Sequence, residues 1–116
     1  MYQVRYTIIL KQILKYQLPN GKIPFDEWLI GLDKAKKAEV LIRLERCKIG
    51  LLGQHRNLTN GITELKFHSG ERIYICEKND VIIILLNAGN KQRQSVDIAK
   101  AIKYIQDYNE RFVKND

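Results

Sequence analysis

Two short segments near the middle of the chain alternate between apolar and polar residues, a pattern typical of β-strands with one buried face. In the first segment Leu65 and Phe67 share one parity, and in the second Ile73 and Ile75 do. If these apolar side chains face one core, the intervening ones gather on the opposite, solvated face of the sheet. The residues expected on that polar face are Glu64, Lys66, His68, Arg72 and Tyr74.

Two further segments also have strand patterns. Val81–Leu86 is apolar on both parities, which favours a central strand covered on both sides. Tyr2–Leu10 alternates and predicts a first strand, while residues 11–18 give no firm pattern. Residues 51–60 are predicted to be a polar connection ending in an Asn-Gly turn.

Helical spacing of apolar residues predicts three helices. Pro24 suits the first turn of a short helix, and Asp33 is expected to cap a second helix that runs to about Ile49. A last helix is expected from Gln92 or Ser95 to about Phe112. The side chains predicted to face the core are Trp28 in the first helix, Ala38, Leu41, Ile42, Leu44 and Ile49 in the second, and Val96, Ala99, Ile102, Ile105 and Phe112 in the last.

The predicted order is therefore one strand, two helices, three strands and a final helix. A helical hairpin separates the first strand from a three-strand meander. This order predicts one α+β domain over residues 1–116, with the helices packed on one face of a small, mostly antiparallel sheet.

Composition adds a bias in charge. The 116 residues carry a net charge of +7, with 45% hydrophobic and 28% charged residues, which is ordinary for a folded domain. A small basic domain favours polyanions or acidic partners, but charge alone does not choose among RNA, DNA, acidic lipid and acidic protein. No apolar run is long enough to span a bilayer, and we expect a cytoplasmic protein with no membrane partner. Cys47 and Cys76 lack metal-ligand spacing, so buried thiols are expected and no metal site.

Several short motifs, taken together and in order, resemble the RelE/HigB-like toxins, and more narrowly the branch of addiction-module killer proteins. They extend from about Phe25 to Tyr104, nearly the whole chain. The motifs are Pro24-Phe25, Glu27-Trp28-Leu29 and Leu32; Arg43-Leu44; Gly61-Ile62 and Glu64-Leu65-Lys66; Gly70 and Arg72-Ile73-Tyr74; and Ile84-Leu85-Leu86-Asn87-Ala88-Gly89-Asn90-Lys91 with Gln94, Asp97-Ile98 and Ala101.

This resemblance implies a RelE/ParE-like toxin fold and the toxin of a type II toxin–antitoxin pair. Members of the family cleave messenger RNA, commonly on the ribosome, with no metal ion or other cofactor. A helix-turn-helix antitoxin encoded alongside silences them, and contact with operator DNA is expected only through that antitoxin. The chain departs from the family pattern at Lys66, Glu71 and Asn90, and Glu71 is expected to put a carboxylate beside the anion site.

Metal-free RNA cleavage requires a proton acceptor for the ribose 2′-OH, cations for the phosphorane and a proton donor for the leaving oxygen. Arg72 and Lys66 are candidate cations, and the resemblance adds Lys91, for which Arg93 can substitute. Glu64 or His68 is a candidate base, and Tyr74 or His68 a candidate acid. Candidate RNA-binding residues are Arg93, Arg43, Arg46 and Lys48.

Other interpretations remain at this point. Glu64 and Lys66 can form a simple surface ion pair, and Gln94 and Asp97 can serve only to cap the last helix. A ParE-like toxin that acts on DNA gyrase, or a basic binding module with no activity, is equally compatible with the net charge.

Overall fold

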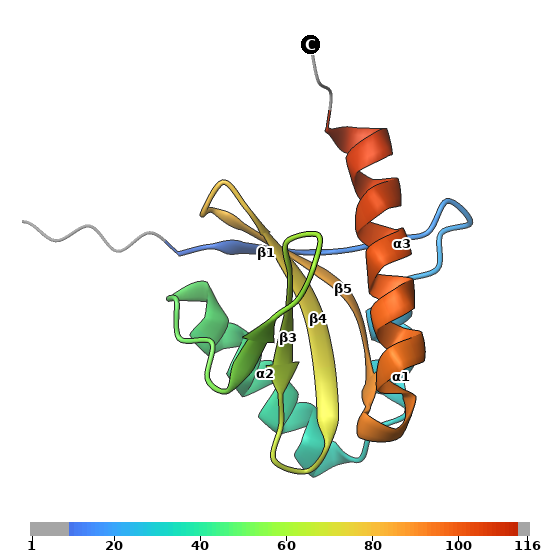
Figure 1. The fold of residues 1–116 in the computed structure, drawn as a ribbon. Helices are drawn as coiled ribbons and strands as arrows, with labels where there is room; N and C mark the ends of the chain where they lie inside the picture. Colours follow the sequence, from blue (N-terminus) through green and yellow to red (C-terminus); the bar gives the residue numbers. More distant parts are fainter. Residues whose placement is uncertain (1–9, 114–116) are drawn as a thin grey trace, which may run out of the picture.

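The computed structural model describes residues 10–113, which form a five-stranded sheet and three α-helices (Figure 1). The sheet is mostly antiparallel, so the predicted α+β class is confirmed. The strand expected over Tyr2–Leu10 falls almost wholly outside the described residues. The elements are β1 (Gln12–Lys15), α1 (Pro24–Ile30), α2 (Lys34–Lys48), β2 (His55–Asn57), β3 (Ile62–Lys66), β4 (Glu71–Lys78), β5 (Ile82–Asn90), a 3₁₀ turn (Lys91–Arg93) and α3 (Gln94–Phe112).

The strands lie in the order β1-β5-β4-β3-β2. The three strands β3, β4 and β5 form the predicted antiparallel meander, and β1 pairs in parallel with the first half of β5. A β-bulge between Tyr74 and Ile75 shifts the register of β4 against β5. The strand β5 is central along Ile82–Leu85 and loses its neighbour β1 beyond that point.

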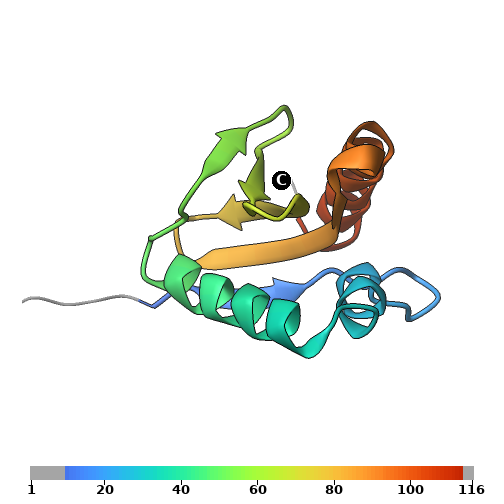
Figure 2. The same ribbon diagram turned by 90° about the horizontal axis from the view of Figure 1, so that it is seen from below.

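Helices cover both faces of the sheet, so the prediction that they pack on one face is wrong. Figure 2 shows α1 and α2 below the sheet and α3 above it. We call these two sides the α2 face and the α3 face. Each has its own apolar core: Leu65, Phe67, Ile73 and Ile75 lie in the core of the α2 face, and Ile62, Tyr74, Cys76 and Ile84 in the core of the α3 face.

The two helices of the predicted hairpin begin where the sequence indicates. Pro24 occupies the first position of α1, and the Asp33 side chain accepts a hydrogen bond of 2.8 Å from the Lys36 backbone N–H. Gly50 follows the end of α2 with a φ of 87°, a left-handed conformation that glycine adopts without a steric cost. Trp28 packs against the core of the α2 face, as predicted.

The predicted inner faces of α2 and α3 are partly wrong. In α2 the buried residues are Val40, Leu44 and Cys47, while Leu41, Ile42 and Ile49 are exposed. In α3 the buried residues are Asp97, Ala101 and Ile105, while Val96, Ala99 and Phe112 are exposed. Both helices carry apolar residues on more than one side, so spacing alone did not identify the buried side.

The short strand β2 was not predicted, because its residues His55–Asn57 are polar and exposed. It pairs antiparallel with β3, where Arg56 lies opposite Glu64. Arg43 on α2 holds this region in place: its guanidinium donates hydrogen bonds of 2.6–2.8 Å to the carbonyls of Leu52, Gln54 and Lys66. The supposed loop is therefore an edge strand tied to a helix.

Candidate nucleic-acid interface

Basic side chains from two strands and from the turn after a third meet at one end of the sheet. Lys66, the last residue of β3, pairs with Arg72 near the start of β4, and Arg72 pairs with Gly89 near the end of β5. Lys91 and Arg93 follow directly in the exposed 3₁₀ turn. We call Lys66, Arg72, Lys91 and Arg93 the basic end. The exposed His68 lies in the β3–β4 connection at the same end of the sheet.

Arg72 is half-buried on the α3 face and its guanidinium is only partly used by the fold. Its Nη1 donates to the carbonyl of Glu71 at 3.0 Å and to that of Phe67 at a longer 3.4 Å. Its buried Nε has no hydrogen-bond partner among residues 10–113. Arginine offers five N–H donors in a planar fork that matches phosphate oxygens, so donors of Arg72 remain for an anion at this point.

Glu64 and Tyr74 lie two residue pairs further into the sheet than Lys66 and Arg72, and both are fully buried. The prediction of a solvated polar face is therefore wrong for these two residues, because α3 covers it. Glu64 accepts a hydrogen bond of 2.8 Å from the Gln94 side chain and forms an ion pair of 3.2 Å with Arg56. The carboxylate thus links β2 to the first turn of α3, and in this conformation neither residue contacts solvent.

Tyr74 remains protonated over the whole physiological pH range. Burial, together with the neighbouring Glu64 carboxylate and the more distant Asp97, strongly raises the pKa of its hydroxyl. The hydroxyl oxygen itself makes no well-aligned hydrogen bond. Tyr74 can therefore donate a proton in a hydrogen bond but cannot act as a base at neutral pH.

Asn87, Gly89 and Asp97 position the start of α3 beside the basic end. The Asn87 side-chain amide donates a hydrogen bond of 3.0 Å to the Asp97 carbonyl, and both residues are buried. A Cβ atom at Gly89 would overlap the Asp97 carboxylate, so only glycine permits this close approach. Burial raises the pKa of Asp97. Neither Asn87 nor Gly89 was a predicted site residue, although both belong to the motif Ile84–Lys91 of the toxin resemblance.

Glu71 points away from the basic end, contrary to the sequence-based prediction. It is buried on the α2 face, where it accepts a hydrogen bond from Ser69 and forms an ion pair of 3.0 Å with Lys36 of α2. Burial alone would raise the pKa of Glu71, but the hydrogen bonds from Ser69 and Lys36 outweigh burial and lower it. Glu71 therefore neither occupies nor neutralises the basic end.

The candidate RNA-binding residues of α2 do not lie with the basic end. Arg43 uses its guanidinium on three backbone carbonyls and stacks over the Phe67 ring, with 4.8 Å from its Cζ atom to the ring centroid. Lys48 forms an ion pair of 2.9 Å with Glu45, and Arg46 is exposed. All three belong to α2, which lies below the sheet in Figure 2, whereas Arg72 lies on the same face of β4 as Tyr74, whose side chain packs in the core of the α3 face.

Both cysteines are free and buried, as predicted. Within residues 10–113, His, Cys, Asp and Glu side chains form no group of three or more that could hold a metal ion. No helix in that range combines the length and the apolar character needed to cross a membrane.

The sequence of the chain is similar to that of a bacterial protein. A search against protein-family models finds no match. A protein of Haemophilus influenzae, described only as uncharacterised, is 35% identical over 82 residues, which cover 68% of this chain and 83% of that protein. The chain therefore belongs to the same family as this H. influenzae protein.

Proposed function

We propose that this protein is the toxin of a type II toxin–antitoxin pair, with the RelE/ParE-like toxin fold, and that it cleaves messenger RNA without a metal ion. The observation that carries the proposal is the basic end, where β3, β4 and the turn after β5 bring four cations together. The protein acts in the cytoplasm on ribosome-bound message. A cognate helix-turn-helix antitoxin silences it and mediates any contact with operator DNA.

In the proposed reaction the ribose 2′-oxygen attacks the adjacent phosphorus. The 2′-OH proton passes to a base, the bond from phosphorus to the 5′-oxygen breaks, and that oxygen takes up a proton. The products are a 2′,3′-cyclic phosphate and a 5′-hydroxyl. Arg72 supports the phosphorane through its unused N–H donors, with Lys66 and Lys91 as further cations, because charge builds on the equatorial oxygens in the transition state.

His68 is the best candidate for proton transfer, because it is exposed at the basic end. An imidazole can accept and donate a proton at neutral pH, so it can serve either the 2′-oxygen or the leaving 5′-oxygen. Glu64 and Tyr74 are buried, so their direct contact with RNA would require α3 to move. We instead assign Glu64 a positioning role, since it holds Arg56 and Gln94 on either side of the site.

The proposal is tested by expressing the protein in a bacterial host while following growth, total transcripts and gyrase–DNA complexes. We expect growth arrest, loss of intact messages and new 5′-hydroxyl ends within coding regions. Arrest with intact messages and trapped gyrase–DNA complexes would instead indicate a ParE-like toxin. Normal growth at a confirmed level of folded protein would contradict the toxin proposal altogether.

A further inference from the structure

A row of apolar side chains on α2 faces solvent, opposite the side that packs on the sheet. Leu41, Ile42 and Ile49 are 51%, 53% and 51% exposed, and the exposed Ala38 lies in the same row. We call Ala38, Leu41, Ile42 and Ile49 the outer stripe. Because the inner side of α2 is occupied by Val40, Leu44 and Cys47, the helix has two apolar sides, and residues 10–113 cover only one of them.

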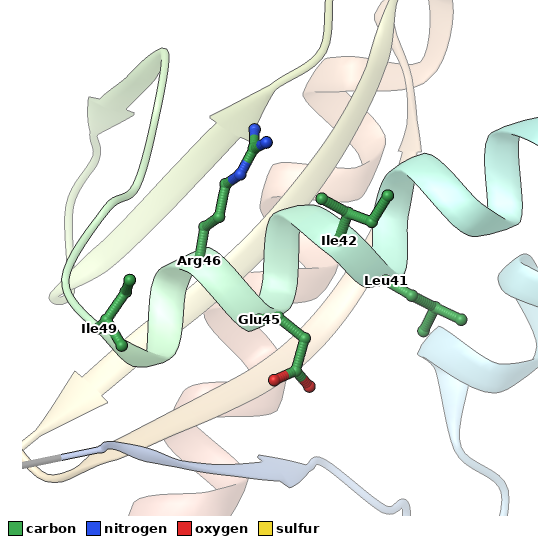
Figure 3. Close-up of a pocket in the computed structure, with 5 residues that line it drawn as sticks. All are labelled: Leu41, Ile42, Glu45, Arg46 and Ile49. Carbon is green, nitrogen blue, oxygen red and sulfur yellow. The ribbon is translucent and has the colours of Figure 1, made fainter.

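The outer stripe borders a hollow. Leu41, Ile42, Glu45, Arg46 and Ile49 line an open cavity of about 380 Å³, and Figure 3 shows these side chains projecting from α2. Two further cavities continue along the helix and share Arg46 with the first. Leu51, which is 57% exposed, lines one of them. A hollowed apolar surface of this kind accepts inserted side chains, which single exposed apolar residues do not.

The charges beside the outer stripe are mostly positive. Helical spacing places Lys34, Lys37 and Arg46 three or four residues from its members, and the two carboxylates Glu39 and Glu45 at the same spacing. Glu45 is already paired with Lys48 at 2.9 Å. The surface around the stripe is therefore net positive, like the whole chain with its charge of +7.

We propose that the outer stripe is the docking surface for an acidic amphipathic helix of another protein. Apolar positions three, four and seven residues apart match the row of side chains that such a helix presents. Carboxylates flanking that row would meet Lys34, Lys37 and Arg46, which gives the complex its specificity and its sensitivity to salt. The proposal rests on α2 alone and holds whether or not the chain cleaves RNA.

A second copy of this chain fits the stripe less well than an acidic helix. Two copies would bring two net-positive surfaces together, and like charges at an interface oppose association. An acidic bilayer also attracts lysines, but Glu45 lies among the members of the outer stripe, where it would be pressed against the anionic lipid headgroups.

The probe for the test is a synthetic peptide of about three heptads, with leucine at the a and d positions and glutamate at e and g. A second peptide carries lysine in place of every glutamate. Each is titrated into isotopically labelled protein, and backbone amide shifts are followed by nuclear magnetic resonance. We expect the acidic peptide to shift the amides of residues 34–50, and its affinity to fall as salt is added.

Two variants identify the surface. Ile42→Glu combined with Ile49→Glu should weaken binding of the acidic peptide at least about tenfold, the factor that ~1.4 kcal/mol represents. Ile30→Glu on α1 is the matched control, since Ile30 is 77% exposed and lines no cavity of the outer stripe, and it should bind as the parent does. Thermal melts confirm that each variant is folded.

Four outcomes would overturn the proposal. The first is a set of shifts that maps to α3 or to no contiguous surface, and the second is equal binding of the lysine peptide. The third is a set of shifts at the stripe caused by protein concentration alone, which would mean that a second copy binds there. The fourth is tighter binding to vesicles of phosphatidylglycerol than to the acidic peptide, which would mean that the stripe binds a lipid surface.

Discussion

Arg72 and Arg43 are both half-buried arginines that differ in what their guanidinium groups contact. Arg43 has Nε, Nη1 and Nη2 each bonded to a backbone carbonyl. Arg72 donates only through Nη1, to two carbonyls, and within the described part of the chain its buried Nε has no partner. Every guanidinium nitrogen of Arg43 is bonded to the backbone, whereas two of the three nitrogens of Arg72 are not. This difference separates a structural arginine from a candidate functional one.

Replacing Arg72 with alanine should abolish cleavage while leaving the protein folded. Loss of a cation that acts mainly in the transition state costs about 10²–10³-fold in rate. A half-exposed side chain with two weak backbone contacts contributes about 1 kcal/mol or less to the free energy of unfolding. Arg72→Lys keeps the charge without the planar fork, so its rate should lie between those of the parent and the alanine variant.

The measurement is the rate of message cleavage, accompanied by a thermal melt of each variant. Lys103→Ala, a change on the exposed side of α3, serves as the control for loss of one positive charge. The Lys36 side chain would be a poor control because it pairs with Glu71. If Arg72→Ala cleaves message as fast as the parent does, the assignment of the basic end is wrong.

Arg43→Ala should show the opposite profile. Three carbonyls would lose a charged donor, and the contact with the Phe67 ring would disappear, so we expect a loss of about 2–3 kcal/mol in the free energy of unfolding. Urea unfolding measures this loss. At a temperature where the variant remains folded, its cleavage rate should equal that of the parent. A variant as stable as the parent but slower in cleavage would instead favour direct RNA contact by Arg43.

At the scale of elements, α2 is joined to the meander by an ion pair between the buried Glu71 and the partly exposed Lys36. Glu71 of β4 accepts from Ser69 and from Lys36 of α2, and these contacts lower its pKa in the folded protein. A carboxylate with a lowered folded-state pKa contributes stability at pH values above its unfolded pKa, and this contribution is lost as pH falls through the folded pKa.

The difference in unfolding free energy between the parent and Glu71→Gln should therefore depend on pH. It should be largest near neutral pH and shrink as the solution is acidified below about pH 4.3, the ordinary pKa of glutamate. Urea unfolding of both proteins between about pH 3 and pH 7 provides the measurement. A difference that stays constant, or grows on acidification, would show that the Glu71 charge does not stabilise the fold.

Most of the elements could be predicted because they leave a local pattern, whereas β1 (Gln12–Lys15) lies in residues 11–18, which gave no firm pattern. The period-2 alternation of β3 and β4, the apolar run of β5 and the caps of α1 and α2 depend on neighbours in sequence. The strand β2 leaves no such pattern, because its three residues are exposed and are held by β3 and Arg43 rather than by their own burial. Tertiary contacts define this strand, so sequence alone did not indicate it.

The local sequence pattern could not predict which helix packs on which face of the sheet. Alternation indicates that Glu64 and Tyr74 lie on the same face of the sheet, but it does not indicate that α3 covers them. The expectation that Glu71 lies beside Arg72 had a different fault. Successive side chains of a strand point to opposite faces, and Glu71 accordingly pairs with Lys36 on the other side of the sheet. The four cations of the basic end lie at strand ends and in the turn after β5, where no helix buries them fully, and their functional role stays a prediction.

At the scale of the whole molecule, the proposed reaction site and the proposed docking surface lie on different sides of the sheet. Arg72 shares its face of β4 with Tyr74, whose side chain packs in the core of the α3 face. The outer stripe belongs to α2, which Figure 2 shows on the other side of the sheet. A partner seated on the outer stripe would leave Arg72 open unless another part of that partner reached around the sheet. Changes to the two surfaces should therefore have separable effects.

If the acidic helix belongs to the cognate antitoxin, a variant of the stripe should stay toxic and escape neutralisation. Ile42→Glu with Ile49→Glu should arrest growth as the parent does, because neither residue lies at the basic end, and half-exposed positions tolerate glutamate with little loss of stability. Co-expression of the antitoxin should restore growth for the parent and for the Ile30→Glu control but not for this variant. The growth rates of the four strains, with and without antitoxin, provide the measurement, and Arg72→Ala as the fourth should grow in both conditions. A double glutamate variant that the antitoxin still neutralises fully would place the antitoxin elsewhere on the molecule, even if the synthetic acidic peptide binds α2.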